Sequence, residues 1–474
     1  MDNMIERLDS ICLYLLFSKH MIKFVRLFKG GKKMTNKTQD AIYDVKELGT
    51  AKTLVLGFQH LFAMFGATVL VPLLTGLDVS TTLLFAGLGT LLFHFITKGK
   101  IPAFLGSSFA FLGGYFTICP MLADGSSNVA MIPYACFGVA CAGLLYLVLA
   151  ALIKVYGANK IMKFFPPIVT GPIIIAIGLT LSQTAIDSCA SNWFIALVAI
   201  VTVVVCNIFG KGMIKIVPIL IGVIASYGTA MALGAVDFSG VASAAWLGFP
   251  IHKEMTVLAL FENCDMSLLI TSIITIMPIA LATIVEHIGD ISAISSTTGI
   301  SYIKEPGLHR TLIGDGLATI VASLFGGPAN TTYGENTGVL NLSKVYDPKV
   351  VRIAAVLAIL FSFCPKFSAI IQAMPSATVG GISLVLYGMI SAVGVRNVVE
   401  NNIDFTESRN VILAALILVL SIGVHYSAAG AIVFNLGQFT ISLSGLATGA
   451  LTGIILNAIL PGSEVDVENY KNGK

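Results

Sequence analysis

G-G-P-A-N-T-T-Y-G-E-N-T-G, residues 326–338, interrupts an otherwise apolar chain. The stretch holds four glycines, one proline and the carboxylate of Glu335, a combination that a helix crossing a membrane avoids. A second carboxylate, Glu286 in V-E-H-I-G-D (285–290), lies at the end of a long apolar run. Ionisable groups at membrane depth generally serve a function. We therefore expect residues 326–338 and Glu286 to form a binding site.

The composition identifies a polytopic membrane protein. The chain has 474 residues, of which 56% are hydrophobic and 11% charged, and its mean hydropathy is +0.90. Soluble globular proteins carry roughly 25% charged residues. The 8 cysteines show no C-x-x-C or Cys/His metal spacing. The sequence thus predicts lipid as a partner, with no metal, no cofactor and no nucleic acid.

Residues 1–33 are unlike the rest of the chain. A short apolar patch, 11–17, precedes a basic stretch, which reverses the order of a secretory signal. G-G-K-K-M (30–34) is what a purine-rich ribosome-binding site would give if it were translated. We expect Met34 to be the true start. The alternative is a basic amphipathic segment lying on the membrane.

From Thr53 onward, apolar stretches recur that are long enough to cross hydrocarbon, which takes about 20 residues each. Two of them, 311–325 and 328–343, are short. The sequence predicts fourteen spans: 53–75, 79–97, 101–118, 130–153, 164–183, 192–209, 214–234, 266–289, 311–325, 328–343, 351–372, 376–395, 409–425 and 431–459.

The distribution of Lys and Arg supports this count. Cytoplasmic loops concentrate basic residues. With the N-terminus inside, the predicted outer loops hold only Lys253 and Lys366. The inner loops hold fourteen: Lys98, Lys100, Lys154, Lys160, Lys163, Lys211, Lys215, Lys304, Arg310, Lys344, Lys349, Arg352, Arg396 and Arg409. We expect both termini to be cytoplasmic and the protein to lie in the cell membrane.

The second half of the chain repeats landmarks of the first half in the same order. Transporters are often built from such repeats. An odd unit of seven spans gives the two copies opposite topology, so the sequence predicts an all-α fold with a 7+7 inverted repeat. The matching pairs are Gln59-His60 with Glu286-His287, Ser107-Ser108-Phe109-Ala110 with Thr331-Thr332-Tyr333-Gly334, and Pro167-x-x-Thr170 with Pro375-x-x-Thr378.

The third and tenth spans, 101–118 and 328–343, are equivalent and too irregular to cross as continuous helices. Each favours an extended piece followed by a half-helix. Irregular backbone at membrane depth is tolerated where it is buried in protein or lines a cavity. Half-helix N-termini favour polar or anionic groups. A binding site near the membrane midplane follows.

Glu286 and Glu335 are the leading site residues. No Lys or Arg lies in the eighth span to pair with Glu286, although a position in headgroup water is the alternative. Glu335 is also placed to cap the tenth half-helix. A flat ligand with alternating donors and acceptors suits two carboxyl groups, because the ionised form accepts and the protonated form also donates. Phe109 and Tyr333 supply ring faces or backbone N–H groups, or simply pack between helices.

From Thr53 to Pro461 the sequence resembles the nucleobase-ascorbate transporter family, a family of nucleobase:cation symporters, and most closely its uracil permease branch. The family signature reads here as Glu335-Asn336-x-Gly338, followed by Ser343-Lys344-Val345. The stretches that carry the resemblance are F-Q-H-L-F-A-M-F-G-A-T-V-L-V-P (58–72), P-A-F-L-G-S-S-F-A-F (102–111), V-E-H-I-G-D (285–290) and N-T-T-Y-G-E-N-T-G-V (330–339).

The resemblance implies that substrate binds between the third and tenth spans. Glu286 and Glu335 should hydrogen-bond the base, with Phe109 and Gly334 adding ring or backbone contacts. Ser383 and Tyr387 of G-G-I-S-L-V-L-Y-G (380–388) should face the site from a gate domain. Glu rather than Gln at 335 is similar to the uracil branch. A homodimer through the gate domain is also implied.

Asp290 departs from the pattern, since uracil carriers have His at this position. A carboxylate one turn from Glu286 favours a proton on that residue by like-charge repulsion, or else builds a cation site. We assign proton or cation coupling to Glu286, Asp290 and His60, and the choice between proton and sodium stays open. Asp315, in Gly314-Asp315-Gly316, is expected to cap or pack.

The expected function is import of uracil by cation symport, with a core domain moving against a gate domain, and no enzymatic activity. The alternatives are a purine symporter taking xanthine or uric acid, and an anion transporter or channel of similar architecture. The expected divisions are an N-terminal segment 1–52, core parts 53–155 (spans 1–4) and 266–374 (spans 8–11), gate parts 156–265 (spans 5–7) and 375–461 (spans 12–14), and a cytoplasmic tail 462–474.

Overall fold

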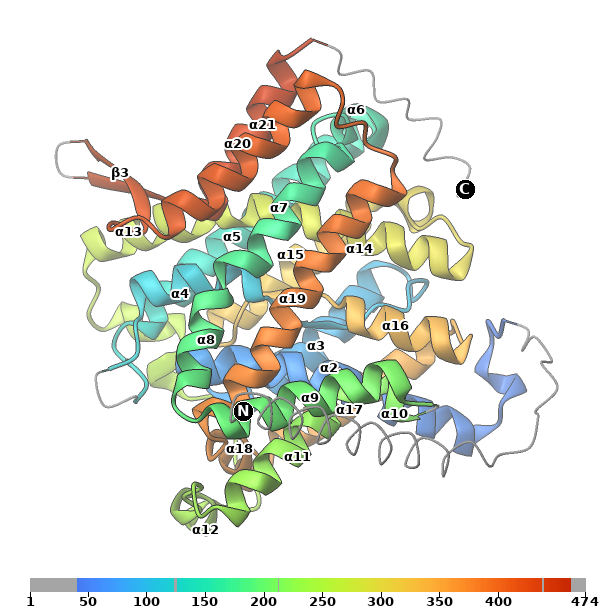
Figure 1. Ribbon diagram of the computed structural model, residues 1–474, viewed down its shortest axis with the longest axis vertical. Coiled ribbons are helices and arrows are strands. Elements are labelled where there is room, and N and C mark those ends of the chain that lie inside the picture. Colours follow the sequence, from blue (N-terminus) through green and yellow to red (C-terminus); the bar gives the residue numbers. More distant parts are fainter. Residues whose placement is uncertain (1–40, 123–125, 212, 437–438, 462–474) are drawn as a thin grey trace, which may run out of the picture. The chain divides into compact units, whose positions relative to one another are not determined.

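The computed structural model describes residues 41–122, 126–211, 213–436 and 439–461 (Figure 1). The expected non-native start, 1–33, and the expected tail, 462–474, lie outside these residues. The chain divides into two units, Met1–Ala41 and Ile42–Lys474. The second unit holds every element described below.

The first half of this unit begins with two long helices and then an irregular segment. After the short 3-10 helix η1 (Val45–Glu47), its elements are α2 (Thr50–Thr75), α3 (Val79–Ile96), β1 (Leu105–Ser107), η2 (Phe109–Phe111), α4 (Leu112–Ile118), α5 (Ile132–Tyr156), α6 (Ala158–Met162), α7 (Pro167–Thr180), α8 (Ser182–Ala190), α9 (Trp193–Phe209), α10 (Met213–Ile216), α11 (Pro218–Ala232) and α12 (Ser239–Ser243).

The second half repeats the motif of a short strand before a short helix. Its elements are η3 (Lys253–Met255), η4 (Val257–Phe261), α13 (Met266–Ile276), η5 (Met277–Ile279), α14 (Ala280–Thr298), η6 (Ile303–Gly307), α15 (Leu308–Leu324), β2 (Asn330–Thr332), α16 (Gly334–Ser343), α17 (Pro348–Ser362), α18 (Pro365–Gln372), α19 (Ser376–Glu400), α20 (Ser408–His425), β3 (Ala431–Leu436), β4 (Phe439–Ser444) and α21 (Gly445–Ile459).

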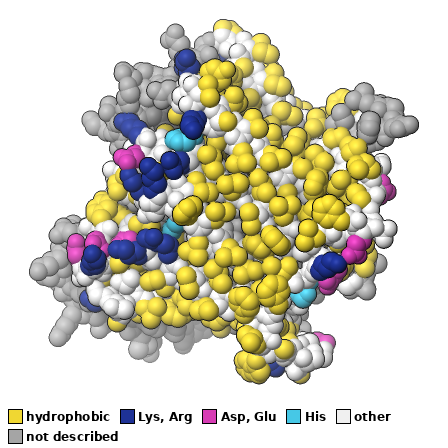
Figure 2. Space-filling model, turned by 180° about the vertical axis from the view of Figure 1, so that it is seen from behind, with side chains coloured by type: hydrophobic (Ala, Val, Ile, Leu, Met, Phe, Trp, Pro, Cys, Tyr) yellow, Lys and Arg dark blue, Asp and Glu magenta, His cyan; other side chains and the backbone are white. Residues whose placement is uncertain are grey.

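The helices are long and apolar enough for a multi-pass membrane protein. By length and composition, seven helical segments of the described residues are able to cross a membrane, or eight when the bent pair α17 and α18 counts as one. The described residues also include shorter apolar helices, α9, α11 and α21 among them. The count of fourteen spans therefore stays a prediction. Figure 2 shows a broad hydrophobic face with Lys and Arg gathered at its margins, as lipid contact requires.

Two of the expected spans are wrong in part. The span 351–372 bends by 89° between α17 and α18, because Pro365 begins a new helix and cannot continue the old one. The span 431–459 is helical only from Gly445, since β3 and β4 form an antiparallel hairpin before it. Phe439 to Ser444 reads F-T-I-S-L-S, and this strict alternation of apolar and polar residues favours a strand.

Close helix contacts through glycine define the interior. At Gly143 of α5, an added Cβ would lie 2.9 Å from the carbonyl oxygen of Gly316 in α15. The two backbones approach too closely for any side chain there. Small residues permit such contacts between membrane helices, where dispersion rather than water exclusion drives packing. α5 and α15 thus form a rigid pair beside the irregular segments.

Candidate functional site

The two irregular segments meet as a small antiparallel sheet. Leu105 of β1 pairs with Thr332 of β2, and Ser107 pairs with Asn330. The expected extended pieces in 101–118 and 328–343 are therefore present, and each is followed by a short helix, α4 (after η2) or α16. Pairing satisfies part of the strands' backbone groups, and the hydroxyls of Thr90 and Thr319 bond the N–H and carbonyl groups of Leu105 and Asn330. Hydrocarbon offers no such partners. The sheet fixes the start of both short helices in one place.

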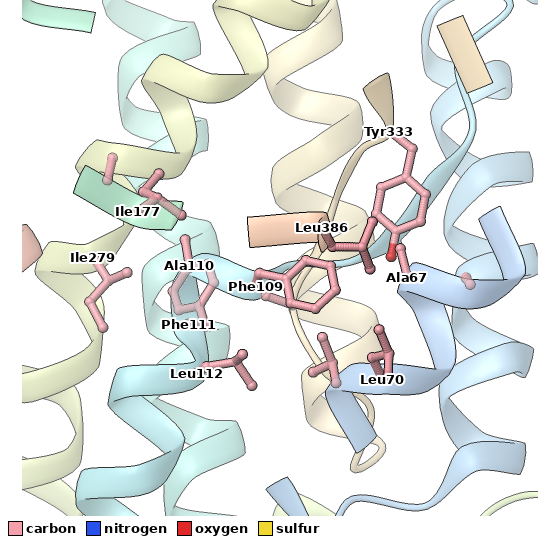
Figure 3. Close-up of a cluster of buried hydrophobic side chains, with 14 of the residues drawn as sticks. Ala67, Leu70, Phe109, Ala110, Phe111, Leu112, Ile177, Ile279, Tyr333 and Leu386 are labelled. Atoms are coloured by element: carbon pink, nitrogen blue, oxygen red, sulfur yellow. The ribbon is translucent and has the colours of Figure 1, made fainter. Parts of the chain in front are cut away.

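Tyr333 fastens this sheet to α2. Its hydroxyl donates to the carbonyl oxygen of Ser107 at 2.9 Å and accepts from Thr68 Oγ1 at 3.3 Å. The ring lies over Gly106, where an added Cβ would approach Tyr333 Cζ to 2.4 Å. Figure 3 shows the hydroxyl pointing toward Ala67 of α2. The side chain of Tyr333 is thus engaged by protein, and its backbone N–H donates to the carbonyl oxygen of Phe104 at 3.0 Å. Tyr333 therefore holds the sheet in place.

Three carboxylates gather at the start of α16. Glu335 lies in the first turn of α16, while Glu286 and Asp290 lie one turn apart on α14. Glu286 and Glu335 are close enough for their charges to act on each other. Asp290 accepts a hydrogen bond from Thr332 Oγ1 at 2.9 Å, and its other oxygen lies 3.9 Å from where a Cβ on Gly334 would be. β2 and α14 together hold this acidic group.

Open space adjoins the carboxylates. Glu286, Asp290 and Glu335 are each half-buried, whereas Gly334 and Gly338 on α16 are exposed. A Cβ added at Gly338 would meet no atom within 4 Å. Gly334 and Gly338 are four residues apart and so share one face of α16. This face leaves room for a ligand beside the acidic side chains.

η2 and α19 carry the remaining predicted site residues. Phe109 lies in η2, and Ser383 and Tyr387 lie in α19. The rings of Phe109 and Tyr387 meet edge to face, with centroids 5.6 Å apart. Figure 3 shows Phe109 in the buried cluster that also contains Leu386 of α19. Ser383 and Tyr387 are buried one turn apart, and neither hydroxyl is bonded to another element of the described chain. Two polar groups are therefore available where α19 faces Phe109.

His60 is placed against α16 rather than among the carboxylates. The amide of Asn336 lies 3.1 Å from His60 Nδ1 and donates to the His60 carbonyl oxygen at 3.0 Å. His60 is fully buried. This contact joins α2 to α16. The sequence marked Asn336 only as part of the family signature and predicted no contact for it.

Asp315 packs, as expected, but against a histidine that sequence reasoning missed. Asp315 Oδ2 lies 2.9 Å from His287 Nδ1, at an angle unsuited to a regular hydrogen bond, and both side chains are fully buried. The rings of Phe93 and Tyr146 meet His287 edge-on. The adjacency of His287 to Glu286 was the available signal. Among the described residues, no group of three or more His, Cys, Asp or Glu side chains is arranged to hold a metal ion.

Comparison with known proteins gives a consistent set of relatives. Residues 51–430 match the family model described as "Permease family". The chain is 40% identical to the uracil permease of Bacillus caldolyticus over 441 residues, which cover 90% of this chain and 96% of the relative. It is 41% identical to the uracil permease of Bacillus subtilis (strain 168) over 416 residues, 85% of this chain and 91% of the relative.

A solved structure resembles the fold. The transmembrane domain of the cyanobacterium bicarbonate transporter BicA aligns with a TM-score of 0.55, covering 88% of this chain and 99% of that one. Sequence identity in this alignment is 14%, so the likeness concerns the fold alone.

Proposed function

The chain belongs to the Permease family, as the resemblance to uracil permeases predicted, and we propose that it imports uracil by cation symport. It is a membrane transporter and not an enzyme. The observation that carries the proposed substrate is the group of half-buried carboxylates at the start of α16, whose face at Gly334 and Gly338 is exposed and leaves open space at Gly338. Uracil is flat and alternates ring N–H donors with carbonyl acceptors. Carboxyl groups match both, since the ionised form accepts and the protonated form also donates.

In this proposal, the base binds between the start of α16 and η2, which carries Phe109. Glu286 and Glu335 hydrogen-bond its edge, the backbone of Gly334 approaches it closely, and Phe109 covers one ring face. Ser383 and Tyr387, whose hydroxyls have no partner on another described element, complete the site from α19. The Phe109–Tyr387 contact supports a site at the boundary between two moving parts.

Transport follows from relative motion of these parts. The core domain comprises 53–155 and 266–374, and the gate domain comprises 156–265 and 375–461. The gate contributes α19, whereas both short helices and the acidic group belong to the core. As the core moves, the site faces one side of the cell membrane at a time. Both termini are cytoplasmic in this proposal, and the gate forms the homodimer contact.

Coupling to a cation rests on the acidic group. Glu286 takes up a proton on the outside and releases it inside, and Asp290 favours this by placing a second negative charge one turn away. A sodium ion held by the same oxygens is the alternative, with Thr332 keeping Asp290 in place. His60 acts through Asn336 by setting the position of α16.

The competing substrates differ in what they require. A purine such as xanthine needs more room beside Gly334 and Gly338. An anion carrier needs positive charge at the short helices, yet no Lys or Arg lies between Gly326 and Ser343. The three carboxylates would repel an anion. Uracil is therefore favoured over both.

The test is uptake of radiolabelled uracil into vesicles, with proton and sodium gradients imposed separately and xanthine as competitor. We expect Glu286→Gln and Glu335→Gln to abolish uptake while inserting normally into the membrane. Glu254→Gln, at an exposed carboxylate that is none of the predicted site residues, is the matched control and should retain wild-type rates. Wild-type uptake by either site variant would refute the site. Strong competition by xanthine would instead favour the purine reading.

A further inference from the structure

A basic surface forms where three helix ends converge. α3 ends at Ile96, α5 ends at Tyr156 and α15 begins at Leu308. Arg310 of α15 donates from Nη1 to the carbonyl oxygen of Ile96 at 3.0 Å, which ties two of these ends together. The positive charges of Arg310 and of Lys154 on α5 both act on the His309 ring, so α5 reaches the same place.

Positive charge is in excess on this surface, which we call the basic patch and define as Lys98, Lys154, Lys304 and Arg310. The three lysines are exposed, and none has an ion-pair partner within the described part of the chain. The nearby acid is Glu305, which already pairs with Lys100. By contrast, the exposed Lys253 is neutralised by an ion pair with Glu262. The patch therefore keeps several unneutralised cations together.

Apolar side chains border the patch. Phe95, just before Lys98, is 83% exposed, while Val155 and Tyr156, just after Lys154, are 75% and 57% exposed. Aromatic residues of this kind mark the level at which membrane helices meet headgroups. Figure 2 shows Lys and Arg gathered at the margin of a wide hydrophobic face. A ligand that fits both parts has an anionic head and a hydrocarbon body.

We propose that the basic patch binds an anionic phospholipid of the cytoplasmic leaflet. Its anionic headgroup lies among the four residues of the basic patch, Lys98, Lys154, Lys304 and Arg310, and its acyl chains lie along Phe95 and Val155. Basic pockets between helices at this side of a membrane hold anionic headgroups in this way. The lipid would brace the ends of α3, α5 and α15 against one another. The inference rests on the proposed orientation of the chain and not on the identity of its substrate.

The test measures thermal unfolding of the full chain in detergent while phosphatidylglycerol or phosphatidylcholine is added. We expect phosphatidylglycerol to raise the melting temperature in a saturable way and phosphatidylcholine to do so far less. Each lysine near an anionic headgroup contributes about fivefold in apparent affinity. The triple variant Lys98→Ala, Lys154→Ala, Lys304→Ala should therefore need on the order of 100-fold more phosphatidylglycerol.

The matched control removes three lysines predicted on the same side but outside the patch, by Lys160→Ala, Lys163→Ala and Lys215→Ala. It should keep the wild-type response, and an equal loss in both triples would overturn a localised site. Glycerol 3-phosphate provides a soluble headgroup, and a full shift from it alone would overturn the lipid assignment. Should the patch triple not fold, Lys98→Ala and Lys154→Ala are tested singly, and an unchanged response in both would refute the proposal.

Discussion

Thr332 offers a sharp test of the acidic site, because its neighbour on β2 is a natural control. Thr332 Oγ1 donates to Asp290 Oδ2 at 2.9 Å, whereas Thr331 Oγ1 has no partner among the described residues. Both side chains are buried to a similar degree, 2% and 3% exposed. Valine has nearly the shape of threonine without the hydroxyl. Thr332→Val and Thr331→Val thus differ in one hydrogen bond.

The expected effect follows from the charge on Asp290. A hydrogen bond to a charged group contributes about 1.5–3 kcal/mol. Since every 1.4 kcal/mol changes an equilibrium constant tenfold, Thr332→Val should lower the equilibrium constant for holding Asp290 beside Gly334 by about 10- to 100-fold. Thr331→Val should be close to neutral, because replacing an unbonded buried hydroxyl by a methyl group leaves nothing unsatisfied.

The assay is initial uracil uptake over a range of concentrations, with protein quantified in the membrane. We expect the initial uptake rate of Thr332→Val to fall by about 10- to 100-fold. The rate of Thr331→Val should remain near that of the wild type. Equal rates for the two variants would show that the bond to Asp290 contributes nothing to transport. Equal losses would show that the strand, and not the bond, is what matters.

Two further exchanges test the packing around the site. Gly106→Ala places a methyl group 2.4 Å from a ring atom of Tyr333, so it should destabilise the fold by about 1–3 kcal/mol and lower the melting temperature. Gly113→Ala is the control, because its methyl group would meet no atom within 4 Å and should leave the melting temperature unchanged. Asp347 is buried and accepts from the backbone N–H groups of Val45 at 3.0 Å and Lys349 at 2.9 Å, so Asp347→Ala should cost about 1–3 kcal/mol by stranding these donors. Asp44→Ala, which removes an exposed partner of Lys349, should change the melting temperature little. Equal shifts within either pair would contradict the packing argument.

The irregular segments were predictable because their composition leaves few alternatives. Proline, glycine and Ser/Thr residues at membrane depth exclude a continuous helix, and the structure has a strand and a short helix in each place. That β1 and β2 pair with each other was not predictable, because register depends on partners far apart in the chain. Tyr333 illustrates the same limit, since its bonds to Ser107 and Thr68 arise from tertiary packing alone.

Other features were missed although a signal existed. In the hairpin before α21, apolar and polar residues alternate along Phe439–Ser444, which indicates a strand. The high proportion of apolar residues in 431–459 nevertheless favoured a membrane span. The adjacency of His287 to Glu286 marked this histidine, but its contact with Asp315 joins two helices, and nothing local to either residue indicates its partner. Local patterns thus predicted elements well and contacts between elements poorly.

The pairing of β1 with β2 has a consequence for biosynthesis. Ser107 and Tyr333 are 226 residues apart, so a ribosome completes β1 long before its partner strand exists. Until then, the carbonyl oxygen of Phe104 and the N–H of Ser108 lack their partners Tyr333 and Ala329, at a depth where lipid offers none. An isolated first half should therefore be held by chaperones or degraded, and supplying the second half as a separate polypeptide should rescue it.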